Sequence, residues 1–275
     1  TQFSLANATP HGVCAGDFDE DGWVDFVSVD QNATRIELFK NKSYDNPTPD
    51  WSNPAATLTP KFEVSTIIEA SSSTPGRLFT TPGSSGDGGH AFGCGDLNGD
   101  GHQDFVLLAN NNEGSGPRPY RADAFLGNGA GGFTARYQLT STNSAGARDM
   151  FNGMKADSEP LIFDYNGDGR NDIILASSAS STSPSLGSGH RGIVRVYFNQ
   201  GDAGWTGDHR HTFNTNSNST LVNQTLTAGN SDRGFNAVTF ADFNEDGIRD
   251  LAAVGVSVGP IRIYYGLAGG GSSAA

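Results

Sequence analysis

The apolar positions of this chain fall in short runs of three to five residues, and polar stretches rich in Gly, Ser, Asn and Asp separate these runs. Long runs of the helix-favouring residues Ala, Glu, Lys and Leu are missing. Short apolar runs bounded by turn-forming residues are typical of β-strands. The pattern therefore predicts an all-β chain.

The apolar runs occur in a fixed order that is repeated four times. In each repeat one run precedes an acidic loop, a second follows it, a third alternates apolar with polar residues, and a fourth opens on a Phe. The runs before the loops are 13–15, 91–94, 161–163 and 238–240, and those after them are 26–29, 105–108, 173–175 and 251–254. The third runs are 36–39, 122–126, 193–197 and 261–265, and the fourth open at Phe62, Phe133 and Phe213. Four antiparallel strands in each repeat predict a β-propeller of four four-stranded blades.

The two ends of the chain bear on how such a ring would close. No Phe-led run follows the third run of the fourth repeat, whereas Phe3 opens a matching run near the N-terminus. The N-terminal strand, at 1–6, is therefore expected to complete the last blade, which also hides a sheet edge. This gives a single propeller domain at 1–266 and a flexible Gly/Ser tail at 267–275. The expected blades are about 11–70, about 89–141, about 158–214 and about 235–266, the last with strand 1–6 added.

The acidic loops begin at residues 17, 96, 164 and 242, and each has Asp or Asn at positions 1, 3, 5 and 9 and Gly at position 6. Alternate positions of a tight loop aim successive side-chain oxygens at one centre, and Ca²⁺ takes six to eight oxygen ligands. The pattern predicts about four Ca²⁺ ions, with the position 7 carbonyl as a further ligand. The expected metal-binding residues are Asp17, Asp19, Asp21, Trp23 and Asp25; Asp96, Asn98, Asp100, His102 and Asp104; Asp164, Asn166, Asp168, Arg170 and Asp172; and Asp242, Asn244, Asp246, Ile248 and Asp250.

Two other metal sites are not expected at these loops. An EF-hand requires a bidentate Glu at position 12 and flanking helices, but that position holds Ser28, Leu107, Leu175 and Ala253. Zinc prefers Cys and His ligands, whereas the expected ligand side chains are Asp and Asn.

Besides these loops, three segments are distinctive: Phe92-Gly93 before the second loop, Gly192–Tyr197 in the third repeat and Gly259–Tyr264 in the fourth. Together with the loops, they resemble FG-GAP or VCBS repeats. Such repeats build integrin α-chain propellers and occur in many bacterial surface proteins. The resemblance implies an extracellular propeller whose calcium ions are mainly structural and which serves adhesion, glycan binding or assembly. Propellers of this family usually have about seven blades, whereas four repeats are visible here. The N-terminal strand favours a closed four-bladed ring.

The formal net charge of -13 argues against a nucleic-acid partner, because binding a polyphosphate requires a basic surface. Thirteen Asp residues lie in the four loops, in a chain with 30 acidic residues, and four Ca²⁺ ions would bring the net charge from -13 to -5. No apolar stretch is long enough to span a membrane. The sequence opens without the basic and apolar regions of a secretory leader, as expected of a mature or trimmed soluble chain.

Two further sets of residues are of interest. A polar residue precedes each loop by six positions, and if the preceding strands line a central channel these side chains form a ligand-binding ring at one mouth: His11, His90, Ser158 and Asn236. Cys14 and Cys94 lie on neighbouring inner strands, where they form either a disulfide in an oxidising compartment or two buried free thiols.

The sequence thus predicts a secreted or cell-surface module that is not an enzyme and serves adhesion or structure. Its expected partners are an extracellular protein, a glycan, or other copies of itself joined into a filament by donation of the N-terminal strand. The alternatives are a glycan-binding lectin and a calcium-dependent polysaccharide lyase. No nucleophile elbow, zinc-protease helix or phosphate loop is present in the sequence.

Overall fold

The computed structural model describes residues 10–30, 35–42, 62–69, 89–110, 120–141, 159–177, 190–201, 205–206, 210–213, 220–225, 235–255, 261–267 and 271–274. These residues form eighteen strands, so the all-β prediction is confirmed. None of the described segments is a helix of the length and apolar character needed to cross a membrane.

Four sheets correspond to the four repeats, which we number in chain order. Repeat 1 contains β1 (Pro10–Gly16), β2 (Asp25–Asp30), β3 (Arg35–Asn41) and β4 (Phe62–Glu69). Repeat 2 contains β5 (Gly89–Gly95), β6 (Asp104–Asn110), β7 (Tyr120–Gly127) and β8 (Phe133–Ser141). In both repeats the strands follow one another in the sheet in chain order, and each acidic loop joins the first two.

Repeat 3 contains β9 (Leu161–Phe163), β10 (Asp172–Ser177), β11 (His190–Tyr197) and β14 (Thr220–Thr225). Its outer strand is β14 and not a strand that opens at Phe213, so that assignment was wrong. Phe213 instead ends β13 (Arg210–Phe213), which pairs in parallel with β8 of repeat 2, and β12 (Trp205–Thr206) pairs with β13. A single Phe does not specify which sheet edge a short strand joins, because backbone hydrogen bonds form at either edge.

Repeat 4 contains β15 (Phe235–Ala241), β16 (Asp250–Gly255), β17 (Arg262–Leu267) and β18 (Gly271–Ala274). β18 pairs with β17 as the outer strand, where the sequence predicted a flexible tail and a strand supplied by residues 1–6. Residues 1–6 themselves lie outside the described residues. β18 consists of small residues that have no apolar alternation, so only its backbone pairing identifies it as a strand.

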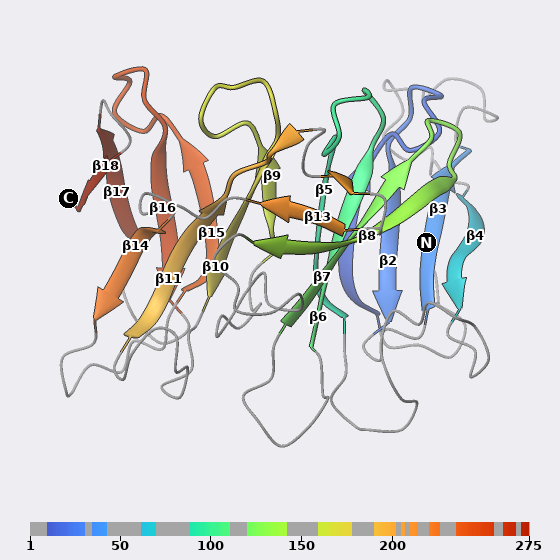
Figure 1. Cartoon of the computed structure of the whole chain (residues 1–275), viewed down its shortest axis with the longest axis horizontal. Coiled ribbons are helices and arrows are strands. Elements are labelled where there is room, and N and C mark those ends of the chain that lie inside the picture. The colour runs from blue at the N-terminus through green and yellow to red at the C-terminus, as the bar shows by residue number, and fades with distance from the viewer. Residues whose placement is uncertain are drawn as a thin grey trace, which may run out of the picture.

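Figure 1 shows the four sheets side by side along the longest axis of the molecule, with repeat 1 at the right and repeat 4 at the left. The first and last sheets lie at opposite ends of this row, so the predicted closed four-bladed ring is not observed. The prediction depended on the N-terminal strand as the outer strand of the last sheet, and β18 occupies that place. The four acidic loops lie along one edge of the row, at the top of the view.

The core consists of three apolar clusters, each between two neighbouring sheets. Alternate residues of a strand point to opposite faces of its sheet, so one central strand serves two clusters. In β6, Phe105 and Leu107 face repeat 1, whereas Val106 and Leu108 face repeat 3, and all four side chains are fully buried. Burying each of them contributes about 1.5–3 kcal/mol. The repeats are therefore held together mainly by packing between successive sheets.

A disulfide joins the first strands of repeats 1 and 2. Cys14 and Cys94 form it with a Cα–Cα distance of 5.9 Å, which settles the alternative that the sequence left open. The backbone of β5 also lies close to the residue that precedes β9. A Cβ on Gly93 would lie 2.5 Å from the Pro160 carbonyl oxygen, so this position requires glycine.

Candidate metal centre

Each acidic loop connects the first two strands of its repeat, and its first Asp organises the turn. The two carboxylate oxygens of Asp96 accept hydrogen bonds from the N–H groups of Gly99 (2.7 Å) and Gly101 (2.9 Å). The loop can close this tightly because Gly101, at position 6, has a φ of 89°, in the left-handed region that favours glycine. The equivalent Gly22, Gly169 and Gly247 have φ angles of 86°, 84° and 83°, so the predicted sharp turn is confirmed in all four loops.

The residues at positions 3 and 5 are paired in three of the loops. In repeat 2, the side-chain amide of Asn98 donates to Oδ2 of Asp100 (2.9 Å), whose Oδ1 accepts the N–H of His102 (2.9 Å). Repeats 3 and 4 have the same two hydrogen bonds, made by Asn166 with Asp168 and by Asn244 with Asp246. These loops thus have side-chain oxygens at the predicted positions, within one turn.

The loop of repeat 1 differs because position 3 is Asp19, which has no N–H to donate. Carboxylate oxygens of Asp17, Asp19 and Asp21 lie within 4.8 Å of one another. The Lys42 ammonium donates to Oδ2 of Asp19 (2.9 Å) and to Oδ2 of Asp21 (3.2 Å), and Lys40 lies 3.8 Å from Asp19. Burial alone would raise the pKa of Asp19, but the hydrogen bond and charge of Lys42 and the charge of Lys40 together lower it.

One oxygen in this cluster has no hydrogen-bond partner. Only 8% of the Asp19 side chain is exposed, and its Oδ1 is buried and unpaired. An unpaired buried carboxylate oxygen is costly, because it loses its contacts with water and gains nothing in return. A hard cation bound between Asp17, Asp19 and Asp21 would provide that partner, and an all-oxygen ligand set suits calcium. The residues of this loop therefore fit a calcium ion.

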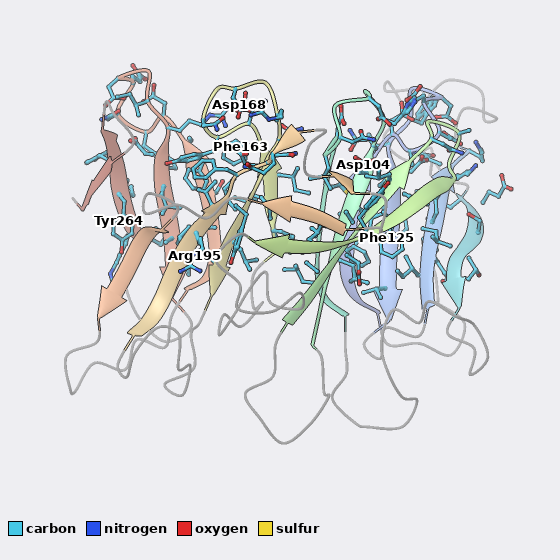
Figure 2. All side chains as sticks on the ribbon, viewed as in Figure 1. Asp104, Phe125, Phe163, Asp168, Arg195 and Tyr264 are labelled. Carbon is cyan, nitrogen blue, oxygen red and sulfur yellow. A yellow bond between two sulfur atoms is a disulfide. The ribbon has the colours of Figure 1, made fainter. Side chains whose placement is uncertain are left out.

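The Asp at position 9 has a structural role that the sequence did not predict. Asp104 is fully buried, and its carboxylate accepts the N–H of Leu97 (2.7 Å) and the N–H of Gly127 (2.8 Å), which ties the loop to the start of the β7–β8 turn. Asp25, Asp172 and Asp250 make the same two backbone hydrogen bonds in their repeats. Their role as metal ligands stays a prediction. Figure 2 shows Asp104 near the upper end of β6 and Asp168 in the loop of repeat 3.

Two of these carboxylates, those of Asp104 and Asp172, have strongly raised pKa values. Burial raises the pKa of Asp104 to about 7; the two backbone hydrogen bonds oppose this rise, and the charges of Asp100 and Asp96 add to it. Burial likewise raises the pKa of Asp172 to about 6. A nearby divalent cation favours the charged form of a carboxylate and would counter both effects.

In repeats 2 and 3 the side chain at position 7 contacts an acidic group. Nδ1 of His102 lies within hydrogen-bonding distance of Oε1 of Glu20 in the loop of repeat 1, and Arg170 forms an ion pair with Asp168 in its own loop. The hydrogen bond with Glu20 raises the pKa of His102. The expected binding of a metal by the carbonyl groups of Trp23, His102, Arg170 and Ile248 stays a prediction.

Successive loops are also hydrogen-bonded to each other. The N–H of Gly131 in repeat 2 donates to the carbonyl of Phe18 in repeat 1 (2.9 Å). In repeat 3, the side-chain amide of Asn199 donates to the carbonyl of Leu97 in repeat 2 (2.7 Å). The carbonyl at loop position 2 therefore accepts a hydrogen bond from the following repeat in both cases. Fixing a loop would consequently also fix the packing of the next sheet.

The second predicted site is only partly described. His11, His90 and Asn236 lie on the first strands β1, β5 and β15, and Ser158 lies outside the described residues. The structure also contains an open cavity of about 520 Å³, which the sequence did not predict. The first strands of repeats 2, 3 and 4 line it, and Arg249 lies beside it with its guanidinium 4.5 Å from the centre of the Phe163 ring. No local sequence motif marks this cavity, because its walls come from three repeats.

The fold and loops define an all-β repeat protein in which an acidic turn joins the first two strands of each four-stranded unit. A family model described as FG-GAP-like repeat matches residues 164–253, which include the loops of repeats 3 and 4. This match supports the FG-GAP family for the stretch that it covers. A comparison with curated proteins finds no match to the chain.

Proposed function

We propose that the protein is an extracellular, calcium-stabilised binding module whose acidic loops hold Ca²⁺ as structural ions. The observation that carries this proposal is the cluster of Asp17, Asp19 and Asp21 with the unpaired, buried Oδ1 of Asp19. The other three loops have the same turn geometry and oxygen-bearing side chains at the same positions. In these three loops a bound Ca²⁺ would be coordinated by oxygens of the side chains at positions 3 and 5, and the hydrogen bond between these two side chains would be lost.

The proposed location outside the cell has three supports. A disulfide persists in oxidising compartments, and Cys14 and Cys94 form one. Extracellular calcium is also abundant enough to fill sites of modest affinity. FG-GAP-like repeats, with which residues 164–253 match, occur in extracellular proteins.

The role that we propose is adhesion or structural support rather than catalysis, with an extracellular protein or glycan as partner. FG-GAP-like repeats are generally non-enzymatic, which supports this choice. The position 9 carboxylates, such as Asp104, already accept two backbone hydrogen bonds. Loops and sheet faces held on a rigid scaffold are the usual place for partner binding.

Calcium binding can be measured directly at one loop. Trp23 lies at position 7 of the repeat 1 loop, so it should sensitise the luminescence of a Tb³⁺ ion bound there, and Ca²⁺ should displace the Tb³⁺. We expect a calcium dissociation constant of about 0.1–1 mM, as in other extracellular modules. Trp23→Phe should remove the luminescence without removing calcium binding measured by equilibrium dialysis. Absence of saturable calcium binding in dialysis would refute the proposal.

Lys42 is expected to weaken calcium binding in the repeat 1 loop, because its ammonium contacts two of the carboxylates that would bind the ion. Lys42→Met should therefore raise the calcium affinity of this loop by about tenfold, or about 1.4 kcal/mol, measured by displacement of Tb³⁺. Lys40→Met is the matched control. Its ammonium is farther from Asp19 and also donates to the carbonyl of Ala130 (3.3 Å), so a smaller gain is expected. Equal affinities in wild type and Lys42→Met would contradict this role of Lys42.

A further inference from the structure

The side chain at position 8 of an acidic loop reaches back to the repeat before it. A Cβ added to Gly16, the last residue of β1, would lie 2.9 Å from Oε1 of Gln103 in repeat 2. In repeat 3, the side-chain amide of Asn171 donates to the carbonyl of Asp96, directly after β5 (2.8 Å). Two neutral side chains thus contact the end of the preceding first strand.

Repeat 4 has a charged residue, Arg249, at this position. Its guanidinium lies 4.5 Å from the centre of the ring of Phe163, the last residue of β9. The ring attracts the cation, but it does not satisfy the five N–H donors of a guanidinium. Within the part of the chain that the structure describes, the Arg249 side chain has no ion pair and no hydrogen bond. Its donors therefore remain available to an anionic group.

Arg249 lines the cavity of about 520 Å³, and most of the other described walls are apolar. Residues 160–163 of repeat 3 and Phe240 of repeat 4 contribute these walls. Phe163 meets Phe240 edge to face at 5.5 Å, so packing between the two repeats holds the aromatic part in place. The volume is within the range of ligand-binding cavities, about 300–1,000 Å³.

The single guanidinium favours a carboxylate as the group that it binds. A planar guanidinium pairs with a carboxylate through two parallel hydrogen bonds, and the two charges cancel. A phosphate group has up to two charges and three acceptor oxygens, which one arginine does not satisfy. Among the described residues that line the cavity, Arg249 supplies the positive charge.

The walls favour an apolar group beside that carboxylate rather than a sugar ring. A sugar has hydroxyl groups around its ring, and burying them against Leu161 and Ile162 without hydrogen-bond partners is costly. An aliphatic side chain, in contrast, is stabilised by removal from water in the same place. A peptide that has both an acidic and an apolar side chain meets both requirements.

We propose that this cavity binds a segment of an extracellular partner protein in which a carboxylate adjoins an apolar side chain. Arg249 binds the carboxylate, and the apolar side chain packs against the walls from repeats 3 and 4. The inference rests on the proposed function, because it names the chemistry of the partner that the binding module recognises. Figure 2 shows Phe163 just below the acidic loop of repeat 3, so the site lies near the loop edge of the row.

The test is an NMR titration with the peptide acetyl-Gly-Leu-Glu-Leu-Gly-amide, in which a glutamate stands between two leucines. The backbone N–H signals of Phe163 and Phe240 should shift and saturate, with a dissociation constant of about 1 mM. The same peptide with Gln in place of Glu has nearly the same shape but no charge. It should bind at least about tenfold more weakly. Glucuronate represents an acidic sugar and should bind more weakly than the Glu peptide.

Variants of Arg249 separate direct contact with the carboxylate from an indirect effect. Arg249→Gln should weaken binding of the Glu peptide by at least about tenfold and should no longer distinguish the two peptides. Arg249→Lys keeps the charge but loses the planar pair of donors, so it should weaken binding by about threefold. Arg262→Gln is the matched control. It removes a guanidinium from β17 of the same repeat, outside the described walls of the cavity, and should bind like wild type.

Filling the cavity provides a second test that leaves Arg249 in place. Thr239 lines the cavity and is exposed, so Thr239→Trp should occupy the space without disturbing the core. This variant should lose binding of the Glu peptide, and near-ultraviolet circular dichroism verifies that every variant is folded.

Four results would overturn the proposal. They are the absence of a saturable shift, equal binding of the two peptides by wild type, wild-type affinity in folded Arg249→Gln or Thr239→Trp, and tighter binding of glucuronate than of the Glu peptide.

Calcium distinguishes a failure of this proposal from a failure of the proposed function. Asp242 and Asp246 lie in the same loop as Arg249, and their negative charges repel a carboxylate. A Ca²⁺ ion bound in this loop would offset them, so the Glu peptide should bind several-fold more tightly in calcium than in EDTA. If dialysis finds no calcium binding while the peptide still binds and requires Arg249, the calcium proposal fails and the cavity proposal is supported.

Discussion

Excess EDTA is expected to lower the melting temperature of the protein by about 12–24 °C. At about 1 mM calcium, a site with a dissociation constant of about 0.1 mM stabilises the folded state by about 1.4 kcal/mol, because the unfolded chain has no preformed site. Four such loops contribute about 6 kcal/mol, and a chain of this size gains about 2–4 °C per kcal/mol. Differential scanning calorimetry with and without EDTA measures this effect.

The size of the shift distinguishes four stabilising ions from one. Among the residues that the structure describes, Asp19 Oδ1 is the buried side-chain oxygen without a hydrogen-bond partner, and a single ion bound beside it would account for a shift of only about 3–6 °C. EDTA already saturated with calcium is the control for ionic strength, and added Ca²⁺ should restore the melting temperature. If EDTA leaves the melting curve unchanged, the loops do not hold structural calcium.

The strands and loops could be predicted from the sequence because each depends on local pattern. Alternation placed Ile36–Phe39 in β3, and the glycine at position 6 identified a left-handed turn in every loop. The Cys14–Cys94 disulfide was one of two alternatives, since spacing along the chain does not give the distance between two strands. Local sequence pattern therefore specifies the strands and loop of one repeat, but not which other strand or sheet they pair with.

The arrangement of the units could not be predicted in the same way. Closure of a ring depends on the small rotation between successive sheets, which no residue pattern encodes. β18 was missed because Gly271–Ala274 pairs through its backbone and has no apolar side chains to mark it. Phe213 was expected to open the outer strand of repeat 3, but it ends β13, which pairs through its backbone with β8 of repeat 2.

The loop chemistry that the sequence missed depends on contacts between segments that are distant along the chain. Lys42 reaches Asp19 across 23 residues, and Asp104 accepts the N–H of Gly127 across the same separation. A loop motif contains only its own residues. It therefore does not show that the Lys42 ammonium would compete with a metal, or that the Asp104 carboxylate binds the backbone of a distant turn. Comparing equivalent positions of the repeats shows where their packing differs. Phe18 is buried, for example, whereas the equivalent Phe243 in repeat 4 is exposed.

Breaking the Cys14–Cys94 disulfide is the second change for which we expect a large effect. The bond connects residues separated by 80 positions, and closing a loop of this length restricts the unfolded chain by an amount worth about 4 kcal/mol. Cys14→Ser/Cys94→Ser should therefore lower the melting temperature by about 8–16 °C. Local opening should begin between repeats 1 and 2, because the disulfide crosslinks β1 to β5 there. Hydrogen exchange of these two strands should report that local opening.

Reduction of the wild type provides the matched comparison for this variant. Protein treated with a reductant should melt at the temperature of the Cys14→Ser/Cys94→Ser variant, because both lack the same crosslink. The variant itself should be indifferent to the reductant, which separates loss of the bond from other effects of the reagent. Titration of thiols in unreduced, denatured protein should find none from this pair. Two reactive thiols in protein prepared from an oxidising compartment would show that the bond does not form, and the support it gives to an extracellular location would be lost.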